Sequence, residues 1–303
     1  MPSTAPHPWR MFLPLAIVLV LALFWTAYWF AASGIARDRL AEERIRWASK
    51  GLAITCTQDD WGGYPFHFEF SCTSPMITLA DRAELRSADL LLVALAYAPW
   101  QVAALIDGPT TLLAAGISPF EITHQRALAA ATFDGDWQPS LSVDVPALSV
   151  PGLGQAEKMM LFTRPAAANG MDISLRGQNV IYRREGKPEV TINDVSFLGT
   201  LLADQSLRVD KIELQHGQLR YWGSGALSLD PQHRIAGQIE TETNDMQALL
   251  ALVGPQLGLS ESNLANIQTM LSLMGKGTKV PIIAKDGALY VGPLKVAELA
   301  PLY

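Results

Sequence analysis

The sequence predicts a mainly β protein of the α+β class. An N-terminal transmembrane helix precedes an extended, curved antiparallel β-sheet, with a late helical hairpin packed on it. Three observations predict this architecture. Residues 11–32 carry no charge. Short runs of alternating apolar and polar residues recur between turn residues after position 52, which is typical of antiparallel strands. From residue 244 to residue 275 the apolar spacing changes to that of helices.

The uncharged run at residues 11–32 predicts a membrane anchor. As a helix it would be about 33 Å long, enough for a hydrocarbon core of about 30 Å. A cleavable secretory signal has a shorter apolar region, so we interpret the run as an uncleaved signal anchor preceded by a cytoplasmic segment, residues 1–10. The small residues Gly34 and Ala36 leave a cleaved, secreted product as the alternative.

The charges beside the anchor and the two cysteines favour opposite orientations. Arg10 is the only Lys or Arg shortly before the anchor, whereas five follow it between Arg37 and Lys50. The positive-inside rule would therefore place the large domain in the cytoplasm, although long domains often translocate regardless of flanking charge. Together with the cysteines considered below, this leads us to predict a single-pass inner-membrane protein with a periplasmic domain over residues 52–303.

Residues 33–51 predict an amphipathic stalk helix that stops at Gly51. Its apolar positions lie among charged neighbours: Ile35, Leu40, Ile45 and Trp47. Such a helix could lie on lipid headgroups or pack on the sheet, and we favour packing on the sheet.

The first clear strand has one aromatic face. Phe66, Phe68 and Phe70 alternate with polar residues, so they are expected to point to the same side. This face is the candidate apolar groove. It must be covered, either by the protein's own core, with residues 244–275 as the expected cover, or by an apolar ligand.

Further elements follow from the same patterns. Residues 90–106 are apolar enough to suggest a second membrane span, but Pro99 interrupts them, so we predict two buried strands instead. Residues 207–243 predict a three-stranded antiparallel meander. The helical hairpin at 244–275 consists of one helix opened by Asn244 or Asp245 and stopped by Gly254-Pro255, and a second over 260–275. Asp286-Gly287 then predicts a hairpin turn.

Cys56 and Cys72, the two cysteines of the chain, flank Gly63 at the centre of a predicted hairpin. A turn there brings them opposite, or nearly opposite, each other on paired strands, within the range of a disulfide. Zinc would need about four clustered ligands, and a redox pair would more often be C-x-x-C. We therefore predict a disulfide, which persists in oxidising compartments and favours the periplasm.

No pattern for catalysis, metal binding or cofactor binding stands out. The net charge of −6 and the pI near 5.4 argue against a nucleic-acid partner. The five histidines are scattered, and residues 152–157, GLGQAE, lack the third glycine of a dinucleotide loop. His67 and Glu69 share the polar face of one strand, which is more typical of a solvated surface than of acid–base chemistry. We predict no enzyme, no metal site and no cofactor.

Several stretches resemble a bacterial family known only as a domain of unknown function, number 2125. The resemblance lies in Tyr28-Trp29-Phe30, GYPFHF at 63–68, LAYAPW at 95–100, GSGALSLD at 223–230 and DGALYVGP at 286–293. It implies a membrane-anchored protein and supplies no catalytic residues. The β-rich layout is also similar, more distantly, to AsmA-like envelope proteins, which are associated with lipid handling.

Two functions remain open from the sequence. The first is a binding or transport module that shelters lipid or another apolar ligand in envelope maintenance. The second is a structural or assembly protein whose sheet binds other envelope proteins. A contiguous exposed apolar channel would favour the first, and a filled sheet face would favour the second.

Overall fold

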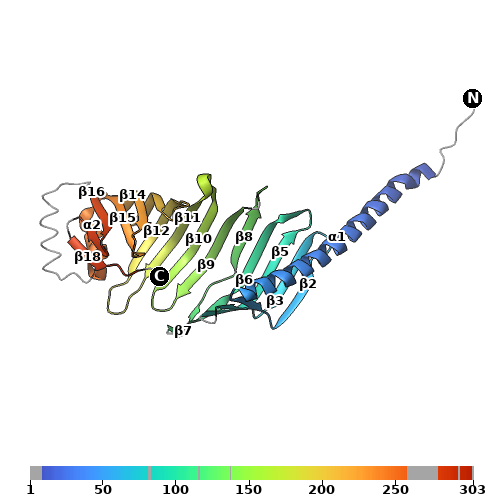
Figure 1. Cartoon of the computed structure of the whole chain (residues 1–303), viewed down its shortest axis with the longest axis horizontal. Coiled ribbons are helices and arrows are strands. Elements are labelled where there is room, and N and C mark those ends of the chain that lie inside the picture. Colours follow the sequence, from blue (N-terminus) through green and yellow to red (C-terminus); the bar gives the residue numbers. More distant parts are fainter. Residues whose placement is uncertain are drawn as a thin grey trace, which may run out of the picture.

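The chain folds into one long antiparallel sheet with a helix at each end (Figure 1). The computed structural model describes residues 9–80, 83–114, 117–136, 138–257, 279–292 and 294–301. Within these ranges it contains eighteen strands in one sheet. The predicted fold class, a mainly β protein with an N-terminal apolar helix, a curved sheet and a later helix, is confirmed.

Helix α1 (Trp9–Ser49) joins the predicted anchor and the predicted stalk into one continuous helix of 41 residues. Pro14 lies near its start, where a proline is best tolerated. At its other end Gly51 adopts a positive φ of 84° and its N–H donates to the carbonyl of Ala48 at 3.0 Å. This is the glycine stop that the sequence predicts.

The two halves of α1 have different surroundings. Its residues 12–24 are exposed on every side, whereas from Trp25 onward one stripe, including Trp29, Ser33 and Leu40, faces the sheet. The spacing of three and four residues in this stripe places those side chains on one helix face. The stalk therefore packs on the sheet. Among the described helices, α1 is long and apolar enough to cross a membrane, which is compatible with a single-pass anchor.

The strands follow in chain order. They are β1 (Leu52–Thr55), β2 (Gln58–Gly62), β3 (His67–Thr73), β4 (Met76–Leu79), β5 (Ala83–Leu95), β6 (Ala98–Ala114), β7 (Ile117–Ile122), β8 (Ala127–Phe133), β9 (Pro139–Val150), β10 (Gly154–Ala166), β11 (Gly170–Tyr182), β12 (Val190–Leu201), β13 (Leu207–His216), β14 (Leu219–Leu229), β15 (Ile235–Thr243), β16 (Lys279–Lys285), β17 (Ala288–Val291) and β18 (Leu294–Glu298). A short 3-10 helix, η1 (Ala167–Asn169), joins β10 to β11, and α2 (Met246–Leu257) follows β15.

Nearly all pairing is between strands adjacent in the chain. From β8 to β18 each strand pairs antiparallel with the next one. Before β8, two long strands each pair with two shorter ones along the same edge. Strands β3 and β4 pair with successive parts of β5, and β7 and β8 pair with successive parts of β6. Strands β2 and β1 extend the same edge by pairing with β3 and β4.

The apolar run at residues 90–106 belongs to the paired strands β5 and β6, with the turn at Ala96 and Tyr97. Pro99 lies inside β6, so it does not mark the turn itself. Most of the run is half-buried rather than fully buried. Downstream, the meander predicted over 207–243 is β13, β14 and β15, and Asp286-Gly287 forms the turn between β16 and β17.

The predicted stop of the first late helix is wrong, because α2 continues through Pro255 to Leu257. Asp245 caps the helix, since its Oδ1 accepts the N–H of Ala248 at 2.9 Å. The apolar residues before Pro255 already form two turns of helix. A proline in the last turn removes one main-chain hydrogen bond but does not end the helix. The second predicted helix, over 260–275, lies outside the described residues.

Candidate functional site: an apolar sheet face that begins under helix α1

Paired residues on antiparallel strands point to the same side of a sheet, so the strand register identifies its faces. Following the partners of Phe68 from strand to strand gives a single row of thirteen residues. The row is Phe68, Ala94, Val102, Ala131, Leu141, Thr163, Ile173, Gly199, Val209, Gly225, Ile239, Ile282 and Val291. Thr163 is its one polar member.

A second row on the same face starts at Phe70. It is Phe70, Leu92, Ala104, Ala129, Val143, Leu161, Leu175, Phe197, Ile212, Gly223, Thr241 and Val280. Thr241 is its one polar member, and neither row contains a charge. We call the surface formed by these two rows the apolar face.

The opposite face has a different composition. The row that starts at Ser71 passes through Leu91, Leu105 and Leu128 and is then largely polar. Its charged members are Asp144, Arg176, Glu213, Glu242 and Lys279. The sheet therefore has one face without charges and one that water can solvate, which is the usual division of a sheet with one covered face.

The protein covers the apolar face unevenly. Phe70 is 4% exposed beneath α1, whereas Leu141 and Leu175 in the central strands are 42% and 37% exposed. Their neighbours Val143, Leu161 and Phe197 are half-buried. A large apolar surface that reaches solvent marks an interaction or ligand-binding site more often than a packed core.

Of the three predicted groove residues, the structure brings Phe68 and Phe70 together and places Phe66 elsewhere. Phe68 is 9% and Phe70 is 4% exposed, whereas Phe66 is 58% exposed. The reason is local. The His67 N–H donates to the carbonyl of Gly63 at 2.9 Å, which makes Phe66 part of the turn, and β3 begins only at His67.

The expected cover for these phenylalanines, residues 244–275, is wrong for its described part. Helix α2 packs near β14, at the opposite end of the sheet (Figure 1). Helix α1 provides the cover instead. The ring of Trp29 stacks on Phe68 at 5.8 Å between centroids, and the Arg44 guanidinium lies 5.0 Å from the ring centre of Phe70.

Between α1 and the sheet lies a hollow of about 590 Å³. Its walls include Tyr28, Ile35 and Leu40 from the helix and Phe68, Phe70 and Leu92 from the sheet. Arg39 is the one charged residue among its described walls. This size is within the range of small-ligand sites, and the hollow continues into the apolar face.

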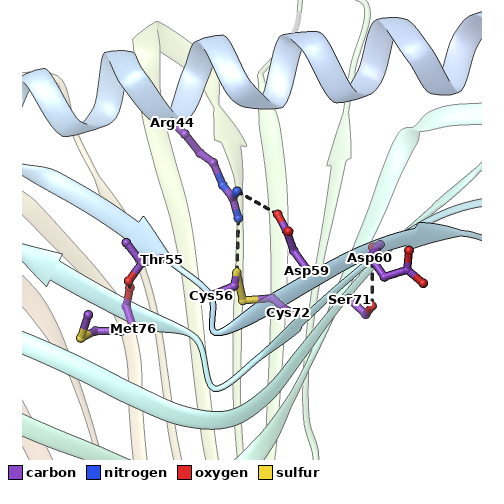
Figure 2. Close-up of a disulfide and its surroundings, with 8 residues drawn as sticks. All are labelled: Arg44, Thr55, Cys56, Asp59, Asp60, Ser71, Cys72 and Met76. Atoms are coloured by element: carbon purple, nitrogen blue, oxygen red, sulfur yellow. Dashed lines mark hydrogen bonds and ion pairs between the residues drawn. A yellow bond between two sulfur atoms is a disulfide. The ribbon is translucent and has the colours of Figure 1, made fainter.

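The disulfide holds the sheet edge beneath the C-terminal half of α1 (Figure 2). Cys56 and Cys72 are bonded, with their Cα atoms 5.4 Å apart. Cys56 lies in the break between β1 and β2, and the ladder partner of Cys72 is Asp59, so the cysteines are not directly paired. Arg44 of α1 contacts both the disulfide and the adjacent strand β2: its guanidinium lies 3.3 Å from Cys56 Sγ and 3.3 Å from Asp59 Oδ2.

The family follows from a match that covers most of these elements. The chain matches the family described as an uncharacterized protein conserved in bacteria (DUF2125) over residues 29–300. The chain belongs to this family. No curated protein and no solved structure matches it. The matched region of this DUF2125 protein begins at Trp29, so it includes the sheet-facing half of α1 and nearly the whole sheet.

A second hollow of this DUF2125 protein, about 740 Å³, lies between β8 and β13 and is lined by charged and hydroxyl side chains as well as apolar ones. Four of its polar side chains bind one another. Asp172 accepts hydrogen bonds from Thr200 at 2.9 Å and Arg164 at 3.0 Å, and these bonds lower the pKa of its carboxyl group. Arg208 donates to Thr200 at 2.8 Å. Asp172, Thr200, Arg164 and Arg208 therefore form a network of paired surface groups.

Within the described ranges, no group of three or more His, Cys, Asp or Glu residues could hold a metal ion. Sequence reasoning missed two features of the site. Trp29 covers Phe68, although the sequence marks it only as part of Tyr28-Trp29-Phe30, one of the stretches that carry the family resemblance. The two apolar rows were also not predicted, because alternation within each strand does not show which residues pair across strands.

Proposed function

We propose that this protein is a non-enzymatic, membrane-anchored module whose apolar face shelters the acyl chains of lipids or another apolar ligand. The observation that carries this proposal is the pair of rows that cross the sheet without a charged side chain. Exposing apolar surface to water raises the free energy by about 25 cal/mol per Å². An apolar ligand that covers this partly open face would therefore lower the free energy of the protein.

The dimensions of the face favour a path over a single binding site. The row from Phe68 to Val291 crosses thirteen strands, and with about 4.8 Å between strands it is roughly 55–60 Å long. One leaflet of a hydrocarbon core is about 15 Å thick. The row is therefore several times longer than one acyl chain, and ligands could occupy successive positions along it.

The location is part of the proposal. An inner-membrane protein with a periplasmic sheet is supported by the apolar part of α1 and by the disulfide, because disulfides persist in oxidising compartments. The excess of Lys and Arg after the anchor favours the opposite orientation. We give more weight to the disulfide, since the charge rule is weak for long domains. The more distant likeness to AsmA-like proteins stays a prediction.

Site-specific photocrosslinking tests the proposal with a matched pair of leucines. Leu175 lies on the apolar face and Leu198 on the opposite face of the neighbouring strand. They are 37% and 46% exposed, so a photoreactive amino acid is tolerated at either place. The full-length protein is irradiated in membranes, and crosslinked lipid is detected by mass spectrometry. We expect several-fold more lipid at position 175 than at position 198.

Two outcomes would contradict the proposal. Equal capture at both positions would show contact with bulk membrane rather than a specific face. Capture of protein but no lipid at position 175 would favour the structural or assembly role, in which the apolar face binds another envelope protein.

A further inference from the structure

Exposed aromatic side chains gather at the tips of two hairpins, β2–β3 and β5–β6. Tyr64 and Phe66 on the first tip are 52% and 58% exposed, and Tyr97 on the second is 62% exposed. Phe30 of α1, 63% exposed, stacks on Tyr64 with ring centroids 5.9 Å apart. The Ala96 N–H donates to the Phe66 carbonyl at 2.9 Å, which joins the two tips. We call Phe30, Tyr64, Phe66 and Tyr97 the aromatic collar.

The two hairpin tips are fixed to α1 by hydrogen bonds from helix side chains to turn carbonyls. Three aromatic side chains of the helix donate hydrogen bonds to main-chain carbonyls of the tips, and each donor–acceptor distance is 2.8 Å. The pairs are Trp25 Nε1 to Pro65, the Tyr28 hydroxyl to Ala96 and Trp29 Nε1 to His67. Turn carbonyls at a protein surface usually bind water. Inside hydrocarbon each would need a partner from the protein, and here these three have one.

The part of the helix that is free of the sheet is too short to cross a hydrocarbon core by itself. Residues 12–24 are exposed on all sides, and the fourteen residues 11–24 between Arg10 and Trp25 make about 21 Å of helix. A hydrocarbon core is about 30 Å thick. The missing length of about 9 Å corresponds to the next six residues of α1, so Trp25 to Phe30 would lie in the core together with the hairpin tips bonded to them. A tilted helix would need still more residues to cross.

The charges agree with this depth. No Asp, Glu, Lys or Arg occurs in residues 11–36 of the helix, in residues 61–66 at the first tip or in residues 90–106 around the second. The next charges along α1 are Arg37, Asp38 and Arg39, about two turns beyond Phe30. Aromatic residues followed by arginines are typical of the boundary between hydrocarbon and headgroups.

We propose that the aromatic collar is embedded in the bilayer leaflet that faces the sheet, so that the sheet enters the membrane by its hairpin tips. The hollow under α1 then opens at the edge of the hydrocarbon, because Tyr28 and Phe68 line the hollow beside the tips. This arrangement rests on membrane anchoring by α1. It does not depend on whether the apolar face carries lipid.

Nitroxide spin labels measure the depth of the collar. Phe66→Cys and Tyr97→Cys each provide one reactive thiol, since Cys56 and Cys72 are bonded to each other. Tyr182→Cys, on β11 and 36% exposed, is the matched control away from the tips. The full-length protein is placed in vesicles of phosphatidylethanolamine and phosphatidylglycerol, and collisions of each label with oxygen and with a water-soluble nickel chelate are compared.

We expect the ratio of oxygen to nickel collisions at positions 66 and 97 to exceed that at position 182 several-fold, because oxygen concentrates in hydrocarbon and the chelate stays in water. Ratios at 66 and 97 equal to the control would overturn the proposal. So would labels shielded from both reagents, which would indicate a protein partner on the collar. The Leu175 crosslinking result is independent of these labels, so failure of either proposal can be told from failure of the other.

Discussion

Removing the disulfide should loosen one edge of the sheet without unfolding the rest. In the Cys56→Ala, Cys72→Ala double variant, β2 keeps its pairing with β3 but loses the covalent link across the break between β1 and β2. Alanine is preferred to serine here, because Cys72 is 1% exposed and a buried hydroxyl would add its own cost.

The magnitude follows from the size of the closed loop. The cysteines are 16 positions apart, and in the chain-entropy model a loop of that size stabilises the folded state by about 3 kcal/mol. Because 1.4 kcal/mol corresponds to a factor of ten, opening of the β2–β3 hairpin should become roughly 100-fold more frequent. The sheet beyond β6 has its own pairing and should keep its stability.

Hydrogen exchange of the main-chain amides is the assay. The Thr57 N–H, bonded to the Thr73 carbonyl at 3.0 Å, reports on the stapled break, and amides in β11 serve as the internal control. Exchange at Thr57 should accelerate roughly 100-fold in the variant, and in the natural protein after reduction, while β11 stays unchanged. Unchanged exchange at Thr57 in the variant would refute the reasoning, because α1 alone would then hold the edge.

Two further variants test the packing of the sheet. Trp29→Ala removes the bond to the His67 carbonyl and the stack on Phe68, so exchange at the β2–β3 tip should rise at least tenfold. Ile45→Ala, whose side chain lies on the same helix away from that tip and is 73% exposed, should leave exchange there unchanged; equal effects would show that Trp29 has no special role. Gly225→Ala would place a Cβ 2.1 Å from the Gln238 carbonyl oxygen and should lower the melting temperature at a cost of about 1–3 kcal/mol, whereas Gly135→Ala meets nothing within 4 Å and should melt like the natural protein.

Local patterns in the sequence predict most of the elements. The uncharged run at 11–32, the alternation after residue 52 and the Asp286-Gly287 turn each depend on neighbouring residues, and each corresponds to an observed element. Phe66 shows where such reasoning fails. Its spacing fits the aromatic face of β3, but the bond from the His67 N–H to the Gly63 carbonyl places it in the turn.

The cover of the sheet could not be predicted from local patterns. Whether α1 or a later helix packs on Phe68 depends on contacts between residues nearly forty positions apart, and amphipathic spacing does not identify the partner of a helix face. The register has the same limitation. Each strand shows which of its residues share a side, but the unbroken apolar rows appear only when all the strand pairs are aligned.

The chain topology itself explains why the apolar face is so long and so open. From β8 onward each strand pairs with the next, so no connection has to cross a face of the sheet, and the two described α-helices lie at its ends (Figure 1). A sheet with helices on its faces needs crossover connections between its strands, which this order of pairing does not contain. From β8 to β15 the sheet therefore gains apolar surface strand by strand, and the described residues of this span contain no α-helix that could cover it. Under the proposed function, an acyl chain would bury most apolar surface in the central part of the face, where Leu141 and Leu175 are 42% and 37% exposed.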